Sequence, residues 1–154
     1  MKDLVIDSCA LVLIMVGELG EEEFLRNRRT SSYSYDDYRD LVKYIMDYKR
    51  LIVLPNVWTE VDNLLNSIDG NFKYEYIQYL KKLMQVSKEE FIPSQLAPQD
   101  DSFYDLGLTD TLLKICASKN YKLITADSYL SNYAQASSIE VYDLVAIKQA
   151  RLNL

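Results

Sequence analysis

Four acidic residues, Asp7, Glu60, Asp110 and Asp127, stand where predicted strands end or predicted helices begin. Clustered carboxylates supply the hard oxygen ligands that Mg²⁺ and Mn²⁺ prefer in proteins. A divalent cation held in this way can activate water against a phosphodiester and offset the charge of the phosphate. The four acids are therefore the candidates both for catalysis and for metal binding.

The absence of histidine and the net negative charge limit the kinds of catalytic site that the chain can form. The sequence contains no histidine, which excludes Ser-His-Asp and Cys-His nucleophile systems, histidine-based ribonucleases and the usual zinc sites. The chain has 17 basic and 23 acidic residues and a net charge of −6. Because its overall field does not attract polyanions, any bound nucleic acid needs local basic groups and a metal ion to neutralise phosphate.

Each acid also has a purely structural interpretation. Asp110 could favour the dipole of its helix, Asp127 could form a turn or an N-cap, and Glu60 could be a solvated helix residue. Asp7 is the sharpest candidate, because a carboxylate directly after a buried apolar strand is costly unless something pairs with it. The joint pattern favours function over these separate explanations.

The elements that must position these acids alternate between strands and helices. Short apolar runs predict buried strands over residues 4–6, 51–54, 122–125 and 139–142, with helices between them, and residues 87–107 are expected to be mostly irregular. This order predicts one α/β domain over residues 1–154, a three-layer α/β/α sandwich around a central, mostly parallel sheet. In such sheets ligands bind beyond the carboxyl ends of the strands, where Asp7 and Asp127 stand.

Local signals predict where several helices begin and end. Ser8 and Thr109 are expected to be N-caps, and Gly70 is expected to end a helix that starts at Asn56. Cys9 and Cys116 lie in apolar contexts and are expected to be small buried side chains. The helix from Asn56 carries an apolar stripe made by Val57, Val61, Leu64, Leu65 and Ile68.

Four segments resemble the motifs of the PIN-domain nuclease family, which includes VapC-like toxin ribonucleases and several RNA-processing enzymes. The resemblance covers nearly the whole chain, and its specificity lies in the order and spacing of the motifs. Cys9 stands where many members have Asn or Ser, and the long stretch between Asp7 and Glu60 implies a helical insertion around residues 21–50. The four segments are Val5-Ile6-Asp7-Ser8-Cys9-Ala10-Leu11, Leu54-Pro55-Asn56-Val57-Trp58-Thr59-Glu60-Val61, Leu108-Thr109-Asp110-Thr111-Leu112-Leu113 and Leu123-Ile124-Thr125-Ala126-Asp127.

The resemblance implies an Mg²⁺- or Mn²⁺-dependent endoribonuclease that leaves 5′-phosphate products. Asp7 and Asp127 would be the principal metal ligands, and Glu60 and Asp110 would complete the site directly or through water. Hydroxyl groups of Ser8 and Thr125 would support the ligands by hydrogen bonding.

Basic and aromatic residues of the implied insertion are candidates for contact with RNA. Arg26, Arg28 and Arg29 form the densest basic group and could contact phosphate, or they could be a solvated helix end. Tyr33, Tyr35 and Tyr38 could stack on bases, although tyrosines at this spacing more often pack against a helix or form a protein interface.

Several alternatives compete with the nuclease. A haloacid-dehalogenase-type phosphatase would need a second Asp where Cys9 stands, and a receiver domain would need a lysine where Ala126-Asp127 ends a strand. A non-catalytic PIN-like module that binds RNA or protein stays open. If the chain is the toxin of a toxin–antitoxin pair, its partners include an antitoxin protein, and the family suggests a homodimer. No apolar stretch is long enough for a membrane span, so the cytoplasm is the expected location.

Overall fold

A five-stranded sheet lies at the centre of the structure. The computed structural model describes residues 2–66 and 70–153. The strands are ordered β3-β2-β1-β4-β5 and every neighbouring pair is parallel. The predicted α/β class is confirmed, and the sheet is wholly rather than mostly parallel. Its strands are β1 (Leu4–Ile6), β2 (Leu51–Val53), β3 (Lys88–Glu89), β4 (Lys122–Thr125) and β5 (Val141–Asp143).

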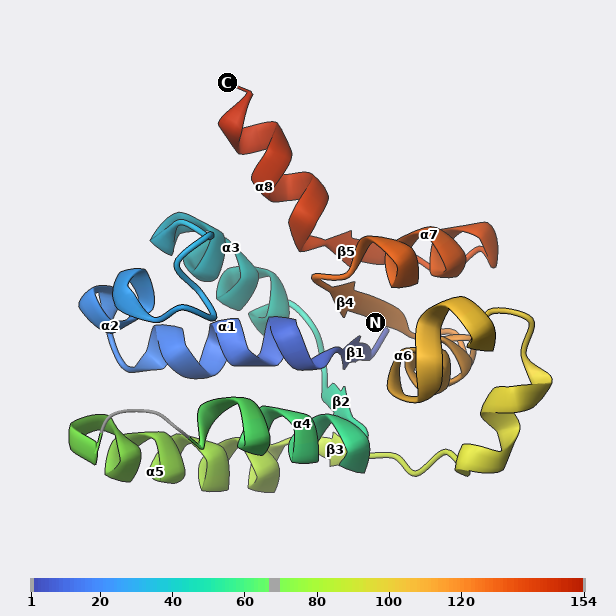
Figure 1. The fold of residues 1–154 in the computed structure, drawn as a ribbon, viewed down its shortest axis with the longest axis horizontal. Helices are drawn as coiled ribbons and strands as arrows, with labels where there is room; N and C mark the ends of the chain where they lie inside the picture. The colour runs from blue at the N-terminus through green and yellow to red at the C-terminus, as the bar shows by residue number, and fades with distance from the viewer. Residues whose placement is uncertain (1, 67–69, 154) are drawn as a thin grey trace.

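Helices flank this sheet (Figure 1). They are α1 (Ser8–Glu18), α2 (Glu21–Arg26), α3 (Tyr35–Met46), α4 (Pro55–Leu65), α5 (Gly70–Val86), the 3₁₀ helix η1 (Ser94–Gln99), α6 (Phe103–Ala117), α7 (Ser128–Ala136) and α8 (Leu144–Leu152). Across the described chain, no helix has both the length and the apolar character that a membrane crossing needs.

The strand order reverses at β1. From there β2 and β3 extend to one side, and β4 and β5 extend to the other. Because crossovers between parallel strands are right-handed, this reversal leaves helices on both faces of the sheet. In such folds ligands usually bind beyond the carboxyl ends of the strands at this reversal, which here are the ends of β1 and β4.

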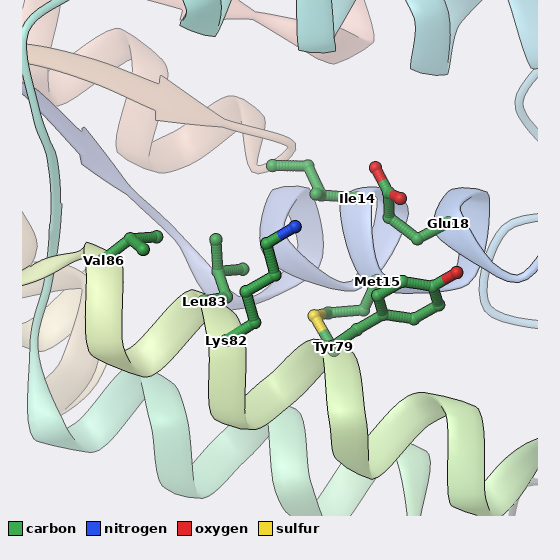
Figure 2. Close-up of a pocket in the computed structure, with 7 residues that line it drawn as sticks. All are labelled: Ile14, Met15, Glu18, Tyr79, Lys82, Leu83 and Val86. Atoms are coloured by element: carbon green, nitrogen blue, oxygen red, sulfur yellow. The ribbon is translucent and has the colours of Figure 1, made fainter.

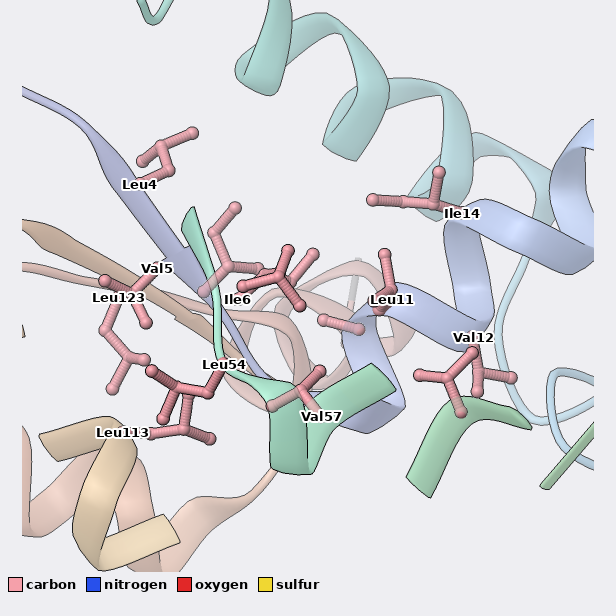
Figure 3. Close-up of a cluster of buried hydrophobic side chains, with 14 of the residues drawn as sticks. Leu4, Val5, Ile6, Leu11, Val12, Ile14, Leu54, Val57, Leu113 and Leu123 are labelled. Atoms are coloured by element: carbon pink, nitrogen blue, oxygen red, sulfur yellow. The ribbon is translucent and has the colours of Figure 1, made fainter. Parts of the chain in front are cut away.

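The hydrophobic core is built around β1 and α1. All three residues of β1 are fully buried, and α1 is buried from Ala10 to Gly17. Figure 3 shows side chains of α1, such as Leu11 and Val12, among those of β1 and α4. Because α2, α3, α4 and α5 all contact α1, this helix needs no polar face, which explains its continuous apolar sequence.

Helices α2 and α3 pack on α1 through aromatic side chains. Phe24 is fully buried, with its ring centroid 5.6 Å from that of Tyr35 and 5.9 Å from that of Tyr38. Gly17 of α1 makes the approach of α3 feasible, because a Cβ at this position would lie 2.3 Å from the Tyr38 ring. Tyr35 and Tyr38 therefore act as packing residues.

The segment 87–107 is more regular than predicted. It contains β3, η1 and the first turn of α6. A two-residue edge strand is too short to show a periodic pattern, so β3 could not be predicted. Thr109 lies inside α6 rather than capping it, and the helix is interrupted at Gly107 (φ 74°), a backbone conformation that glycine adopts at little cost.

Two further local predictions are wrong. Gly70 is the first residue of α5, whereas α4 already ends at Leu65. Cys116 is buried as expected, but Cys9 is exposed. The predicted contribution of Ile68 to the α4 stripe lies outside the described residues.

Candidate active site

Asp7 joins the carboxyl ends of β1 and β4. Its side chain is only 3% exposed. Oδ1 accepts a hydrogen bond from the Ala10 backbone N–H at 2.8 Å, so Asp7, and not Ser8 as predicted, is the N-cap of α1. Oδ2 accepts hydrogen bonds from the Ala126 backbone N–H at 2.9 Å and from the Thr125 hydroxyl. Three donors therefore fix the orientation of this carboxylate.

Asp127 lies directly beside this contact. Its Oδ1 accepts a hydrogen bond from the Leu130 N–H at 2.9 Å and caps α7, so the predicted N-cap interpretation is correct. Its backbone N–H donates to the Thr125 hydroxyl oxygen at 2.9 Å. The buried Thr125 hydroxyl thus connects Asp7 with Asp127, which agrees with the supporting role expected for it. In the described residues, Asp127 Oδ2 accepts no hydrogen bond and is available to a ligand.

Asp110 lies on α6, one turn beyond the interruption at Gly107. The pKa of its carboxyl group is raised to about 7, mainly by partial burial and then by the negative charges of Asp7, Asp127 and Glu60. Within residues 2–66 and 70–153, no hydrogen bond reaches the Asp110 carboxylate. This acid is held close to other acids without a compensating donor.

Glu60 brings a buried oxygen from α4. Its Oε1 atom is inaccessible to solvent and has no hydrogen-bond partner. A buried, unpaired carboxylate oxygen is costly and calls for a donor or a cation. Glu60 is among the acids whose negative charge raises the pKa of Asp110.

Cys9, in the first turn of α1, lies within electrostatic reach of all four acids. The pKa of the Cys9 thiol is raised to about 11, firstly by its partial burial and then by the charges of Asp7, Asp110, Asp127 and Glu60. All four carboxylates thus act on one sulfur atom at the same end of the sheet. We call Asp7, Glu60, Asp110 and Asp127 the carboxylate cluster.

The cluster suits a hard divalent cation. Its donors are oxygens, three of its members are only partly buried, and Glu60 Oε1 lacks any other partner. Burial raises the pKa of Asp7 to about 6 against the effect of its hydrogen bonds, and Asp127 contributes to the same rise. Nearby positive charge would relieve this repulsion.

The four carboxylates do not form a complete coordination shell in the part of the chain that the structure describes. Among the described residues, no three histidine, cysteine, aspartate or glutamate side chains stand close enough together to hold one metal ion. Three hydrogen bonds fix the Asp7 carboxylate, whereas no hydrogen bond reaches the Asp110 carboxylate in the described residues.

The other predicted site residues contribute unequally. Ser8 is buried beside Asp7, but its hydroxyl makes no hydrogen bond to the carboxylate cluster in the described part of the chain. Arg26 pairs with Glu23 on its own helix and lies over the Phe72 ring at 5.8 Å. Arg28 and Arg29 are exposed, and their contact with RNA stays a prediction.

Two contributions were missed by the sequence reasoning. The Ala126 N–H is a backbone group, so no residue type marks it. Tyr33 was predicted only as a residue that could stack on bases, and its place within electrostatic reach of Cys9 and Asp7 was missed. No periodic pattern predicts that juxtaposition, because it depends on how the link between α2 and α3 folds back.

An apolar cavity of about 150 Å³ lies elsewhere, between α1 and α5 (Figure 2). Its α1 residues begin at Ile14, about 10 Å along the helix from Asp7 at 1.5 Å per residue. The cavity is therefore separate from the carboxylate cluster. It is lined by Ile14, Met15, Glu18, Tyr79, Lys82, Leu83 and Val86.

Comparisons with known proteins leave the family open. No protein-family model and no curated protein matches the chain. Among solved structures, the chain is similar to a domain of a functionally unknown protein from Methanocaldococcus jannaschii DSM 2661. The two are 19% identical, the match covers 93% of this chain and 91% of the other, and the TM-score is 0.49.

Proposed function

We propose that this protein is a divalent-metal-dependent endoribonuclease of the PIN type. The observation that carries the proposal is the hydrogen bond from the Ala126 N–H to Asp7. It joins the ends of β1 and β4 at the reversal of strand order, the position at which parallel α/β sheets bind ligands. The electrostatic coupling of Asp110 with Asp7, Asp127 and Glu60 adds the remaining acids.

The residues divide into fixed and free ligands. Asp7 is oriented by its three hydrogen bonds and would present its remaining lone pairs in a defined direction. Glu60, Asp110 and the free oxygen of Asp127 would complete the set. When bound, Mg²⁺ or Mn²⁺ supplies the Lewis acidity that activates water at neutral pH and offsets the phosphate charge.

Electrostatics explain why substrate binding should depend on the cation. The protein carries a net charge of −6, and the carboxylate cluster adds local negative potential at the place where a phosphodiester must approach. Without a cation the cluster repels RNA, so that metal and RNA binding favour each other.

The test is cleavage of a mixed-sequence single-stranded RNA with Mn²⁺, with Mg²⁺ and with EDTA. The wild-type protein should cleave only with metal, and Asp110→Asn should lower the rate by roughly 100-fold or more, as expected for loss of several kcal/mol of charge stabilisation. Asp101→Asn, which removes the charge of an exposed acid just before α6, is the matched control and should cleave like the wild-type protein.

Three results would contradict the proposal: cleavage that survives EDTA, no cleavage with either metal, or equal rates for Asp110→Asn and Asp101→Asn. Binding of RNA without cleavage would favour a non-catalytic module instead.

A further inference from the structure

A lysine of α8 lies over a tyrosine at the side of the carboxylate cluster. The Lys148 Nζ atom is 4.7 Å from the ring centroid of Tyr33, within the range of a cation–π interaction. Tyr33 belongs to the link between α2 and α3, so the contact joins two segments distant in sequence. Both side chains are partly buried.

Tyr33 places this contact close to the site. Partial burial is the main reason that the pKa of its phenol is raised to about 12, and the ionised forms of Cys9 and Asp7 make the next largest contributions. The Tyr33 phenol is thus within electrostatic reach of Asp7, and its ring contacts Lys148.

Helix α8 is held in a defined position by its two ends. It begins directly after β5, with Asp143 as its N-cap, so it starts at the same carboxyl edge of the sheet as the cluster (Figure 1). Near its other end, Arg151 pairs with Asp37 at 2.9 Å and with Asp40 at 2.7 Å, both on α3. These contacts hold Lys148 above Tyr33.

Lys148 contacts an aromatic ring, whereas several other lysines form ion pairs with carboxylates. Lys114 pairs with Asp100 at 2.7 Å, and Lys122 pairs with Glu140 at 3.0 Å. Within the described chain, Lys148 has an aromatic ring and no carboxylate as its partner. An ammonium group on a ring keeps donors for another acceptor, whereas one engaged by a carboxylate is largely neutralised.

We propose that Lys148 binds a backbone phosphate of single-stranded RNA beside the carboxylate cluster, and that Tyr33 positions its ammonium group. The inference rests on the proposed nuclease function. In an acidic protein, a cation at this position gives a neighbouring phosphate a direct contact while the metal offsets the scissile one. Lys148 is a binding residue here, and Tyr33 acts only through it.

The experiment measures kcat and KM for cleavage of labelled single-stranded RNA with Mn²⁺ at several salt concentrations. Lys148→Gln should raise KM by roughly 3- to 10-fold, leave kcat within about twofold, and reduce the log–log salt slope by about 0.7, the loss of one phosphate contact on a single strand. Lys148→Arg should retain most of the wild-type slope. Lys81→Gln, an equal loss of charge from an exposed position on α5, is the control. It should leave KM, kcat and the salt slope unchanged.

Tyr33 is tested by a matched pair. Tyr33→Phe keeps the ring and should keep the wild-type KM, whereas Tyr33→Leu removes the cation–π contact and should raise KM about 2- to 5-fold. Melting temperatures of all variants show whether they are folded, and a Lys148→Gln protein that is unfolded while Lys148→Arg is folded would contradict the proposal, because the lysine would then be needed for the fold.

Different results would overturn the nuclease proposal and the Lys148 phosphate contact. If the wild-type protein cleaves RNA and Lys148→Gln keeps the KM and salt slope of Lys81→Gln, the phosphate contact is wrong and the nuclease stands. If the wild-type protein cleaves no RNA, both proposals are overturned.

Discussion

The Asp7 carboxylate accepts the backbone N–H of Ala126 at 2.9 Å, so an acid at the end of β1 is tied to the residue that precedes Asp127. The same carboxylate accepts two further hydrogen bonds, whereas none reaches that of Asp110 in the described residues. Replacing Asp7 should therefore affect the stability of the protein differently from replacing Asp110.

Asp110→Asn should stabilise the metal-free protein above neutral pH. The Asp110 pKa is raised from 3.8 to about 7, mainly by burial and then by the neighbouring acids. A raised pKa means that the folded state binds the proton more tightly, so this group contributes stability that is complete below about pH 4 and is lost as the pH rises through about 7. The advantage of the variant should grow to about 2 kcal/mol near pH 8, a value discounted for partial exposure.

Urea unfolding in EDTA across this pH range is the measurement, with Asp101→Asn as the control for removing a negative charge. A gap between Asp110→Asn and the wild-type protein that does not widen with pH would show that Asp110 is not under strain.

Asp7→Asn should be less stable than Asp110→Asn in the absence of metal. Both changes remove a charge, but an amide at position 7 would turn an N–H toward either Ala10 N–H or the Ala126 and Thr125 donors. Leaving a buried donor without an acceptor costs about 1–3 kcal/mol. Thermal melts of both variants in EDTA at neutral pH test this order, and a higher melting temperature for Asp7→Asn would contradict the hydrogen-bond account.

Thr125→Val should weaken the site through its geometry. The Thr125 hydroxyl donates to Asp7 and accepts from the Asp127 N–H, and valine fills the same space without either bond. We expect a loss of about 1–3 kcal/mol in the free energy of unfolding and weaker Mn²⁺ binding. Thr125→Ser retains the hydroxyl and should preserve Mn²⁺ affinity. Equal Mn²⁺ affinities for the valine and serine variants would remove Thr125 from the site.

Gly17→Ala should destabilise the packing of α3 on α1. The added Cβ would lie 2.3 Å from the Tyr38 ring, which cannot move freely because it is packed against Phe24 and Tyr35. Overpacking of this kind costs about 1–3 kcal/mol, measurable by urea unfolding. The double variant Gly17→Ala/Tyr38→Leu should lose less stability than the sum of the two single changes. Strict additivity would show that the steric contact is not the cause.

Sequence reasoning predicted best what depends on continuous apolar runs. β1, β2 and β4 are buried strands, as such runs predict, and their parallel order followed from the helices between them. It failed where the signal is short or non-local. The two-residue β3 offers no period, and Gly70 begins a helix although glycine more often ends one.

The candidate site shows the same division. The positions of Asp7 and Asp127 followed from strand ends, because parallel strands finish at one edge of the sheet. The exposure of Cys9 and the approach of Tyr33 and Lys148 were not predictable, since they depend on the path of the α2–α3 link and the tilt of α8. Ser8 was expected to cap α1, but Asp7 performs that role and so binds both α1 and β4.

Titration of Mn²⁺ into the metal-free protein, followed by its melting temperature, tests the carboxylate cluster most directly. A cation that binds only the folded state at about 100 times its dissociation constant stabilises it by about 2.7 kcal/mol, which for a domain of this size corresponds to a rise of roughly 5–10 °C. We predict this rise for the wild-type protein and for Asp101→Asn, and its loss in Asp110→Asn. No rise in the wild-type protein, or an equal rise in Asp110→Asn, would contradict the metal site.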